Sequence, residues 1–220
     1  MTTASQNIDT KTNVYNFNDG KGFVSAHRHK NPDGTIGGWV ANTAIVDSNC
    51  HIDPDAKVYH NAKVLHSCVV LNNAIVRDNA ILKNQVILSD YAIVCGNAKV
   101  SSSSIIRDSA VIADDANVSG LLVTIYECAT VRGAATIRDG ATIFGKALIK
   151  GYAVIKDKSR VSGLATVYGE AIVRDSANVF GNAILCGECI IAGNAWVSGG
   201  TIKGKYIFYR STQITGGVWE

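Results

Sequence analysis

The chain has 220 residues, a formal net charge of +3 at pH 7, and 47% hydrophobic residues, of which few are aromatic. Ile and Val occur 23 times each against 9 Leu, and because β-branched side chains favour strands, this composition argues against a helical bundle. Ile, Val, Leu and Phe account for 60 residues, well above the ~20% typical of disordered chains, so the sequence predicts an ordered all-β fold.

The small net charge also bears on partners. Nucleic-acid binding usually requires a clustered basic face, so a charge of +3 predicts no nucleic-acid partner. Residues 1–15 lack the apolar core of a signal peptide, and no apolar run approaches the ~18 residues of a membrane span. We therefore expect no membrane partner and a cytoplasmic location, in which the six cysteines would be free thiols.

The first 37 residues form a non-repetitive arm. They precede a long repetitive region whose first turn would otherwise expose apolar side chains and unpaired strand edges. We expect residues 1–37 to cap that end, because Phe17, Phe23 and Ile36 provide apolar side chains for the purpose.

Residues 38–197 repeat with a period of six. A small residue is followed two positions later by an aliphatic one through fourteen hexads, the frame slips by one residue at 119–122, and thirteen further hexads follow. Val or Ile fills 24 of the 27 aliphatic positions, and Ala fills 19 of the 27 small positions. Strand alternation would point both side chains of each pair inward, and the other three residues of the hexad would turn a corner.

The corner residues show how many hexads make one coil. The second corner residue is repeatedly Gly or Asp and the third is repeatedly Asn, types that tolerate positive φ or bond their own backbone in turns. Asp139, Asp157 and Asp175 recur at 18-residue intervals, each after a basic residue, so three hexads form one coil. The 27 hexads therefore predict a single parallel β-helix of about nine three-faced coils.

Residues 198–220 follow the repeat. The frame is lost at Lys203, and we expect this segment to cap the C-terminal end of the coils. Its apolar candidates are Tyr206, Ile207, Phe208, Tyr209 and Trp219.

The hexad resembles that of the hexapeptide-repeat superfamily, whose fold is a left-handed parallel β-helix. Within it, the opening motif Gly37-Gly38-Trp39-Val40 and the Asn-Ala-Lys-Val repeats at 61–64 and 97–100 look like a group of poorly characterised bacterial and phage solenoid proteins. The resemblance is specific for the fold and much less so for activity, because one fold hosts many functions.

The outward residues of the strands form columns at 18-residue spacing. A contiguous aliphatic column on a flat face is the kind of patch that marks an interface, and related solenoids assemble as parallel trimers, so we expect a homotrimer. The alternative is that β-branched residues simply suit strands. The predicted interface residues are Ile75, Ile93, Val111, Leu148 and Ile184 in one column, and Val69, Ile87 and Ile105 in another.

Cations recur at the corners as well. Arg138, Lys156 and Arg174 form one column and Arg132, Lys150 and Tyr168 form another, and both are candidate binding sites for an anion or a partner protein. The alternative is a set of solvated corners whose neighbouring charges cancel, with each pair contributing about 0 to 1 kcal/mol.

Acyl transfer is the commonest activity of the resembled superfamily, which uses a His as general base beside acetyl-CoA. If the chain had that activity, His51, His60 and His66 would be the candidate catalytic residues. Against it, the superfamily's acyltransferases usually carry a protruding loop and a late Pro-Gly turn, whereas both prolines of this chain come early. A carbonic anhydrase of the γ class needs three His around zinc, and no third His lies two coils away, so we predict no metal and no cofactor.

The sequence thus favours a non-enzymatic, rigid solenoid that acts as an oligomeric interaction protein. A phage-encoded version would bind a host protein or signalling molecule. The alternative is a hexapeptide-repeat acyltransferase that uses acetyl-CoA.

Overall fold

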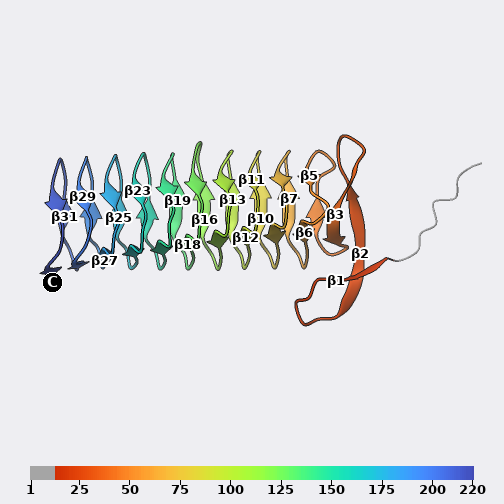
Figure 1. The fold of residues 1–220 in the computed structure, drawn as a ribbon, viewed down its shortest axis with the longest axis horizontal. Coiled ribbons are helices and arrows are strands. Elements are labelled where there is room, and N and C mark those ends of the chain that lie inside the picture. The colour runs from red at the N-terminus through yellow and green to blue at the C-terminus, as the bar shows by residue number, and fades with distance from the viewer. Residues whose placement is uncertain (1–12) are drawn as a thin grey trace, which may run out of the picture.

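The computed structural model describes residues 13–220, which form a straight rod of stacked coils (Figure 1). The described residues contain 33 strands and no helix, and all the strands from β3 onward pair in parallel in three sheets that run the length of the rod. The predicted all-β, single parallel β-helix of three-faced coils is therefore confirmed.

The chain passes from sheet 1 to sheet 2 to sheet 3 and then returns to sheet 1. Sheet 1 contains β1 (Val14–Asn16), β2 (Phe23–Lys30), β3 (Ile36–Ala41), β6 (Lys57–Val58), β9 (Ile75–Val76), β12 (Ile93–Val94), β15 (Val111–Ile112), β18 (Thr130–Val131), β21 (Leu148–Ile149), β24 (Thr166–Val167), β27 (Ile184–Cys186), β30 (Thr201–Lys203) and β33 (Val218–Trp219). Sheet 2 contains β4 (Ile45–Val46), β7 (Lys63–Leu65), β10 (Ile81–Lys83), β13 (Lys99–Ser101), β16 (Asn117–Ser119), β19 (Thr136–Arg138), β22 (Val154–Ile155), β25 (Ile172–Val173), β28 (Ile190–Ile191) and β31 (Ile207–Phe208). Sheet 3 contains β5 (His51–Ile52), β8 (Val69–Val70), β11 (Ile87–Leu88), β14 (Ile105–Ile106), β17 (Thr124–Ile125), β20 (Thr142–Ile143), β23 (Arg160–Val161), β26 (Asn178–Val179), β29 (Trp196–Val197) and β32 (Gln213–Ile214).

The register between coils follows the repeat. Ile75 pairs with Ile93 eighteen residues on, whereas Ile105 pairs with Thr124 nineteen residues on, because the residue added at 119–122 enlarges one corner. The coils continue beyond Val197, where the sequence analysis expected a cap. A shortened corner there reduces the register to seventeen residues, as in the pairing of Ile184 with Thr201.

The interior is filled by the small and aliphatic positions of the hexads. Nearly all of these side chains, from Val40 to Val197, have no more than 1% of their surface exposed and form one continuous core. Gly38, the first small position, tolerates no side chain, because a Cβ there would lie 2.1 Å from the Ala56 carbonyl oxygen. Cys50, Cys68 and Cys189 fill small positions of the hexads and are fully buried, and burial raises the pKa of the Cys68 thiol to about 11.

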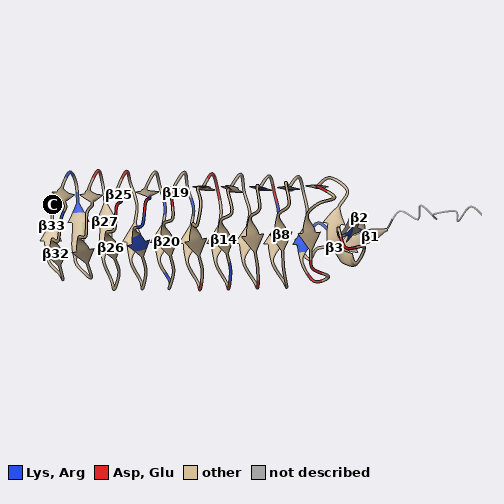
Figure 2. Cartoon of the chain, turned by 90° about the horizontal axis from the view of Figure 1, so that it is seen from above, with Lys and Arg blue, Asp and Glu red and all other residues tan. Residues whose placement is uncertain are grey.

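The second corner residue has positive φ in coil after coil, as the Gly and Asp pattern predicts. Asp side chains at this position also bridge coils. The Asp175 N–H donates to Asp157 Oδ2 at 3.1 Å, and the Gly193 N–H donates to Asp175 Oδ2 at 2.9 Å. Leu122, in the enlarged corner, also has positive φ, at 65°, which is costly for a residue of this type. Figure 2 shows the charged residues gathered mainly in these corners.

The described part of the N-terminal arm, residues 13–37, packs over the first coil, and residues 1–12 of the predicted cap lie outside the described residues. Strands β1 and β2 form an antiparallel hairpin, and β2 pairs antiparallel with β3. Phe17 is buried against Tyr59, with ring centroids 4.6 Å apart, whereas Phe23 and Ile36 are 72% and 59% exposed and cover little.

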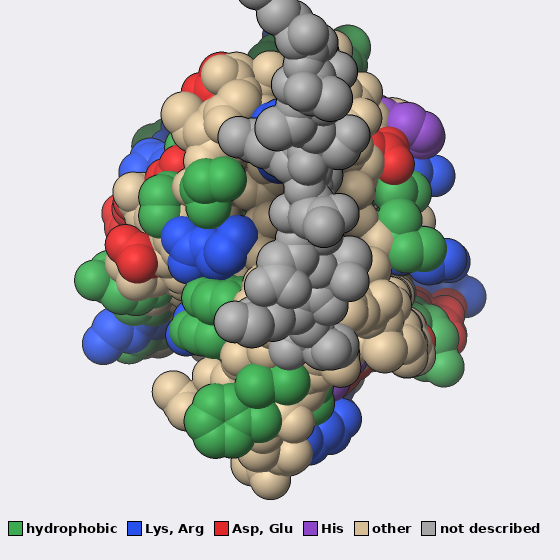
Figure 3. All heavy atoms as spheres, turned by 90° about the vertical axis from the view of Figure 1, so that its right-hand side faces the viewer, with side chains coloured by type: hydrophobic (Ala, Val, Ile, Leu, Met, Phe, Trp, Pro, Cys, Tyr) green, Lys and Arg blue, Asp and Glu red, His purple; other side chains and the backbone are tan. Residues whose placement is uncertain are grey.

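Two polar side chains of the arm complete the first strand of sheet 3. Asn31 Oδ1 accepts from the Ile52 N–H at 2.9 Å, and Asn31 Nδ2 donates to the Ile52 carbonyl at 3.2 Å. His29 Nε2 lies 3.0 Å from the Cys50 carbonyl, and burial lowers the pKa of this imidazole. The backbone of β5, which has no coil before it, thereby gains partners on its open edge. Figure 3 looks onto this end of the rod.

Candidate functional site

The three candidate catalytic histidines lie on different parts of the rod. His51 points outward from β5, with its Nε2 3.1 Å from Asp53 Oδ1. His60 lies in the corner between sheets 1 and 2, and His66 lies in the corner between sheets 2 and 3. Side chains stack in one column only when they are about 18 residues apart, so these three form no common site within the chain.

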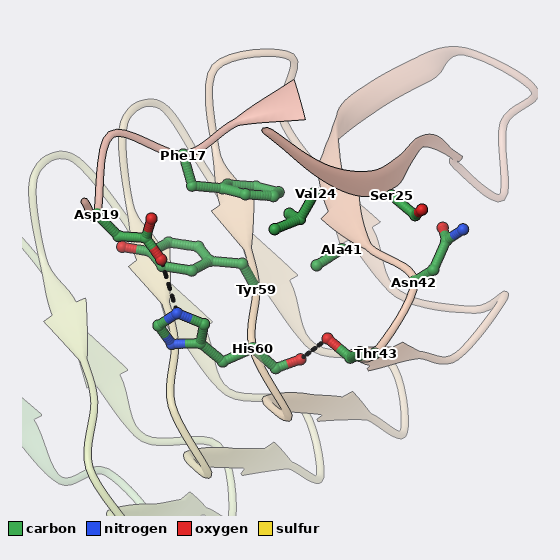
Figure 4. Close-up of a pocket in the computed structure, with 9 residues that line it drawn as sticks. All are labelled: Phe17, Asp19, Val24, Ser25, Ala41, Asn42, Thr43, Tyr59 and His60. Carbon is green, nitrogen blue, oxygen red and sulfur yellow. Dashed lines mark hydrogen bonds and ion pairs between the residues drawn. The ribbon is translucent and has the colours of Figure 1, made fainter. Parts of the chain in front are cut away.

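His60 is the best-connected of the three (Figure 4). Its Nε2 lies 2.7 Å from Asp19 Oδ2, and its Nδ1 lies 2.9 Å from Asp78 Oδ1. Asp19 comes from the loop between β1 and β2, so His60 joins the N-terminal hairpin to the corner of the next coil. The Asp19 contact spans 41 residues and could not be inferred from a repeat that Asp19 does not belong to.

Both carboxylates are stabilised in their ionised form. The Lys21 N–H donates a hydrogen bond to Asp19, and this bond lowers the pKa of Asp19 below its usual value. His60 lowers the pKa further, and burial partly opposes both effects. Burial would raise the pKa of Asp78, but the Gly96 N–H, His60 and Arg77 together lower it. Ionised carboxylates only accept hydrogen bonds, so both ring nitrogens of His60 face oxygens that can accept from it.

A pocket of about 350 Å³ opens beside His60, under the N-terminal hairpin. Its walls are largely apolar, and Thr43 at its rim donates a hydrogen bond to the His60 carbonyl. The pocket is at the small end of the range for ligand sites, and it exists because the hairpin covers the first coil less completely than another coil would. The lining residues are Phe17, Asp19, Val24, Ser25, Ala41, Asn42, Thr43, Tyr59 and His60.

The two predicted cation columns lie on different edges of the rod. Arg138 is the last residue of β19, and Lys156 and Arg174 directly follow β22 and β25, all on sheet 2. Arg138 pairs with the adjacent Asp139, and Arg174 Nη1 lies 3.8 Å from Asp175 Oδ1. Arg132, Lys150 and Tyr168 follow strands of sheet 1, where Lys150 Nζ lies 5.0 Å from the Tyr168 ring centroid. The columns do not converge, so they do not form one combined binding site.

The predicted interface columns are both present as continuous ladders. Ile75, Ile93 and Val111 lie in register on sheet 1, and Val69 and Ile87 lie in register on sheet 3. Ile105 continues the sheet 3 ladder, and Leu148 and Ile184 continue the sheet 1 ladder beyond Thr130 and Thr166. Ile75 is not a free surface residue, because it packs against the aromatic cluster of the hairpin.

Tyr126 and Phe144 are eighteen residues apart in the sequence and stack on the edge between sheets 3 and 1, with ring centroids 5.1 Å apart. The structure adds a cation to each ring, Arg107 over Tyr126 and Arg160 over Phe144, which the sequence analysis did not predict. A second feature that the sequence analysis did not identify is the outward column of sheet 2, which the same 18-residue spacing defines.

Comparisons with protein-family models and with curated proteins find no match to this chain. Across residues 13–220, no helix is long and apolar enough to cross a membrane, and no three or more His, Cys, Asp or Glu side chains are grouped as they would be around a metal ion.

Proposed function

We propose that the chain is a rigid, non-enzymatic interaction protein that presents flat outer faces to protein partners, in the first instance to further copies of itself. The observation that carries this proposal is an apolar band around the edge between sheets 3 and 1. In three consecutive coils, an outward aliphatic side chain on sheet 3 is followed, after one corner, by another on sheet 1. The uncovered pairs are Ile87 with Ile93 and Ile105 with Val111; in the coil before them Val69 is followed by Ile75, which packs against the N-terminal aromatic cluster.

Two side chains in the corners enlarge the apolar band. Leu71 lies two residues after Val69, and Tyr91, which is 66% exposed, lies two residues before Ile93. Monomeric proteins rarely expose contiguous apolar patches of more than a few hundred Å², so a band of this kind is best explained by a protein contact. The rod is suited to such a contact because three paired sheets hold its surface in a fixed shape.

The assembly expected from the sequence is a homotrimer in the cytoplasm, and it is tested by changing the band. A double variant, Ile87→Glu with Ile93→Glu, would bury two charges in the contact and is expected to lose the trimer, so that the mass measured by light scattering falls to one third. The matched control is Thr124→Glu with Thr130→Glu, which makes the same change in the same columns outside the band. A wild-type monomer, or a double variant with unchanged mass, would overturn the proposal.

The hexad and the opening motif support membership of the hexapeptide-repeat superfamily, and a phage-encoded binder of a host protein is the narrower form of the proposal. Acyl transfer is the competing function. Stabilisation by acetyl-CoA in a thermal-shift assay, lost when His51, His60 and His66 are all changed to Ala, would favour the enzyme.

A further inference from the structure

Sheet 2 carries the longest unbroken aliphatic run of the three outward ladders. Val154, Ile172, Ile190 and Ile207 lie in register on β22, β25, β28 and β31. The ladder of sheet 1 is interrupted by threonine after three aliphatic residues, and so is that of sheet 3. This face is separate from the apolar band, because it lies opposite the edge that the band surrounds.

A shallow groove of about 370 Å³ lies on one side of this run. It is lined by Tyr152, Val154, Glu170 and Ile172, and the Tyr152 side chain is 69% exposed. Glu170 has no ion-pair partner within residues 13–220. Aliphatic walls, an aromatic ring and an unpaired carboxylate are together suited to a long cationic side chain, whose methylene groups and charge would each find a partner.

The same coils carry such side chains on the other side of the run. Ile155 and Val173 point inward and are fully buried, so strand alternation turns the next residues, Lys156 and Arg174, outward on sheet 2. One coil therefore presents Tyr152, Val154 and Lys156 in a row. The following coil presents Glu170, Ile172 and Arg174 in a row. Across the described residues Lys156 forms no ion pair, and the contact of Arg174 with Asp175 is long, at 3.8 Å.

These rows are complementary to themselves. A two-fold axis parallel to the rod exchanges left and right on a face while keeping each coil at its own height, so the acidic side of one copy meets the basic side of the other. An antiparallel pair related by an axis across the rod would instead place the side that carries Glu170 against the same side of the partner subunit, and Glu170 would then have no Arg174 to pair with.

We propose that sheet 2 of the C-terminal half is a parallel, two-fold contact between two copies of this chain. In it, the aliphatic runs pack against each other and Arg174 of the partner subunit sits in the groove beside Glu170 and Tyr152. The contact uses residues that the apolar band does not include. Rods that use both surfaces would therefore form assemblies of more than three chains.

Charge reversal tests the contact directly. Glu170→Arg alone places two cations together at both ends of the contact, and Arg174→Glu alone places two anions together. Each variant is expected to weaken the pair by about tenfold or more, so that the mass measured by sedimentation equilibrium falls to that of the assembly held by the band alone. An equimolar mixture of the two variants regains an opposite charge at both places, so pairing is expected to return in the mixture.

Lys99→Glu is the matched control, because Lys99 points outward from β13 on the same sheet but outside the aliphatic run. Circular dichroism establishes that each variant is folded. The inference is overturned if the wild-type protein is a monomer or a trimer, if the single variants keep their mass, or if the mixture stays dissociated. The Ile87 and Ile93 double variant leaves sheet 2 untouched, so failure of the two-fold contact and failure of the band are separate outcomes.

Discussion

The coils and the N-terminal end of this rod are built by different rules. In the coils, a residue's position in the 18-residue period fixes its neighbours, as when Asp157 and Asp175 bridge successive turns. At the N-terminal end, neighbours come from unrelated positions, as when Asp19 contacts His60 and Tyr15 stacks on Trp39 at 4.5 Å. The contacts within a periodic segment can thus be inferred from its repeat, whereas the contacts that close its end involve residues outside the repeat.

The largest change in stability is expected from a substitution in the coil interior, where the repeat fixes the packing. Ile143 is fully buried midway along the rod, and Ile143→Ala should lower the free energy of unfolding by about 2 to 5 kcal/mol through lost burial and an unfilled cavity. Chemical denaturation measures this change. Thr142→Ala, one residue away but outward, should change it by at most about 0.5 kcal/mol. Equal effects at the two positions would contradict the inward and outward assignment.

A pH-dependent effect is expected at the N-terminal end. The folded structure lowers the pKa values of Asp19 and Asp78, so the stability they contribute is present above their unfolded value of about 4 and is lost as the pH falls below it. Hydrogen exchange of residues 14–26, corrected for intrinsic rates, should show protection falling between pH 6 and pH 3.

Asp19→Asn separates this contact from general acid unfolding. The variant keeps an oxygen acceptor for His60 but loses the charge, so protection of the hairpin at pH 6 should be lower and its fall on acidification smaller. Exchange of the coil amides near Ile143 provides the internal reference. An unchanged acid response in the variant would remove Asp19 from the explanation.

The smallest effect is expected at the enlarged corner, where the periodic rule is broken by one residue. Leu122 has positive φ and is 75% exposed, so its backbone conformation is unfavourable and its side chain gains no burial in return. Leu122→Asn should raise the free energy of unfolding by about 1 kcal/mol, because Asn tolerates this conformation better. The same change at Leu121, which has no positive φ, should be close to neutral in the denaturation assay.

Much of the fold could be predicted because the patterns that determine it lie within a few neighbouring residues of each hexad. The inward pair, the corner types and the shift at 119–122 are all visible in the sequence, and each has a direct consequence for register. Past Val197 the prediction failed because one corner is a residue shorter and aromatic residues replace small and aliphatic ones, as Tyr206 and Phe208 do where they pack against the core. The candidate site was less predictable. His60 was identified, but its partner Asp19 and the covering of Ile75 depend on how the hairpin folds back.

The sequence by itself determined the repeat, the number of faces and the residues that line the core, because these depend only on alternation along a strand and on three corners per coil. Tertiary structure decided which outward residues share a face with a charge of opposite sign, which aliphatic side chains stay uncovered, and how the first coil is closed. Those outcomes depend on distances between segments that are remote in the chain. For that reason the columns of the band follow from the sequence, whereas their partial covering by the hairpin and the charged groove on sheet 2 follow only from the assembled rod.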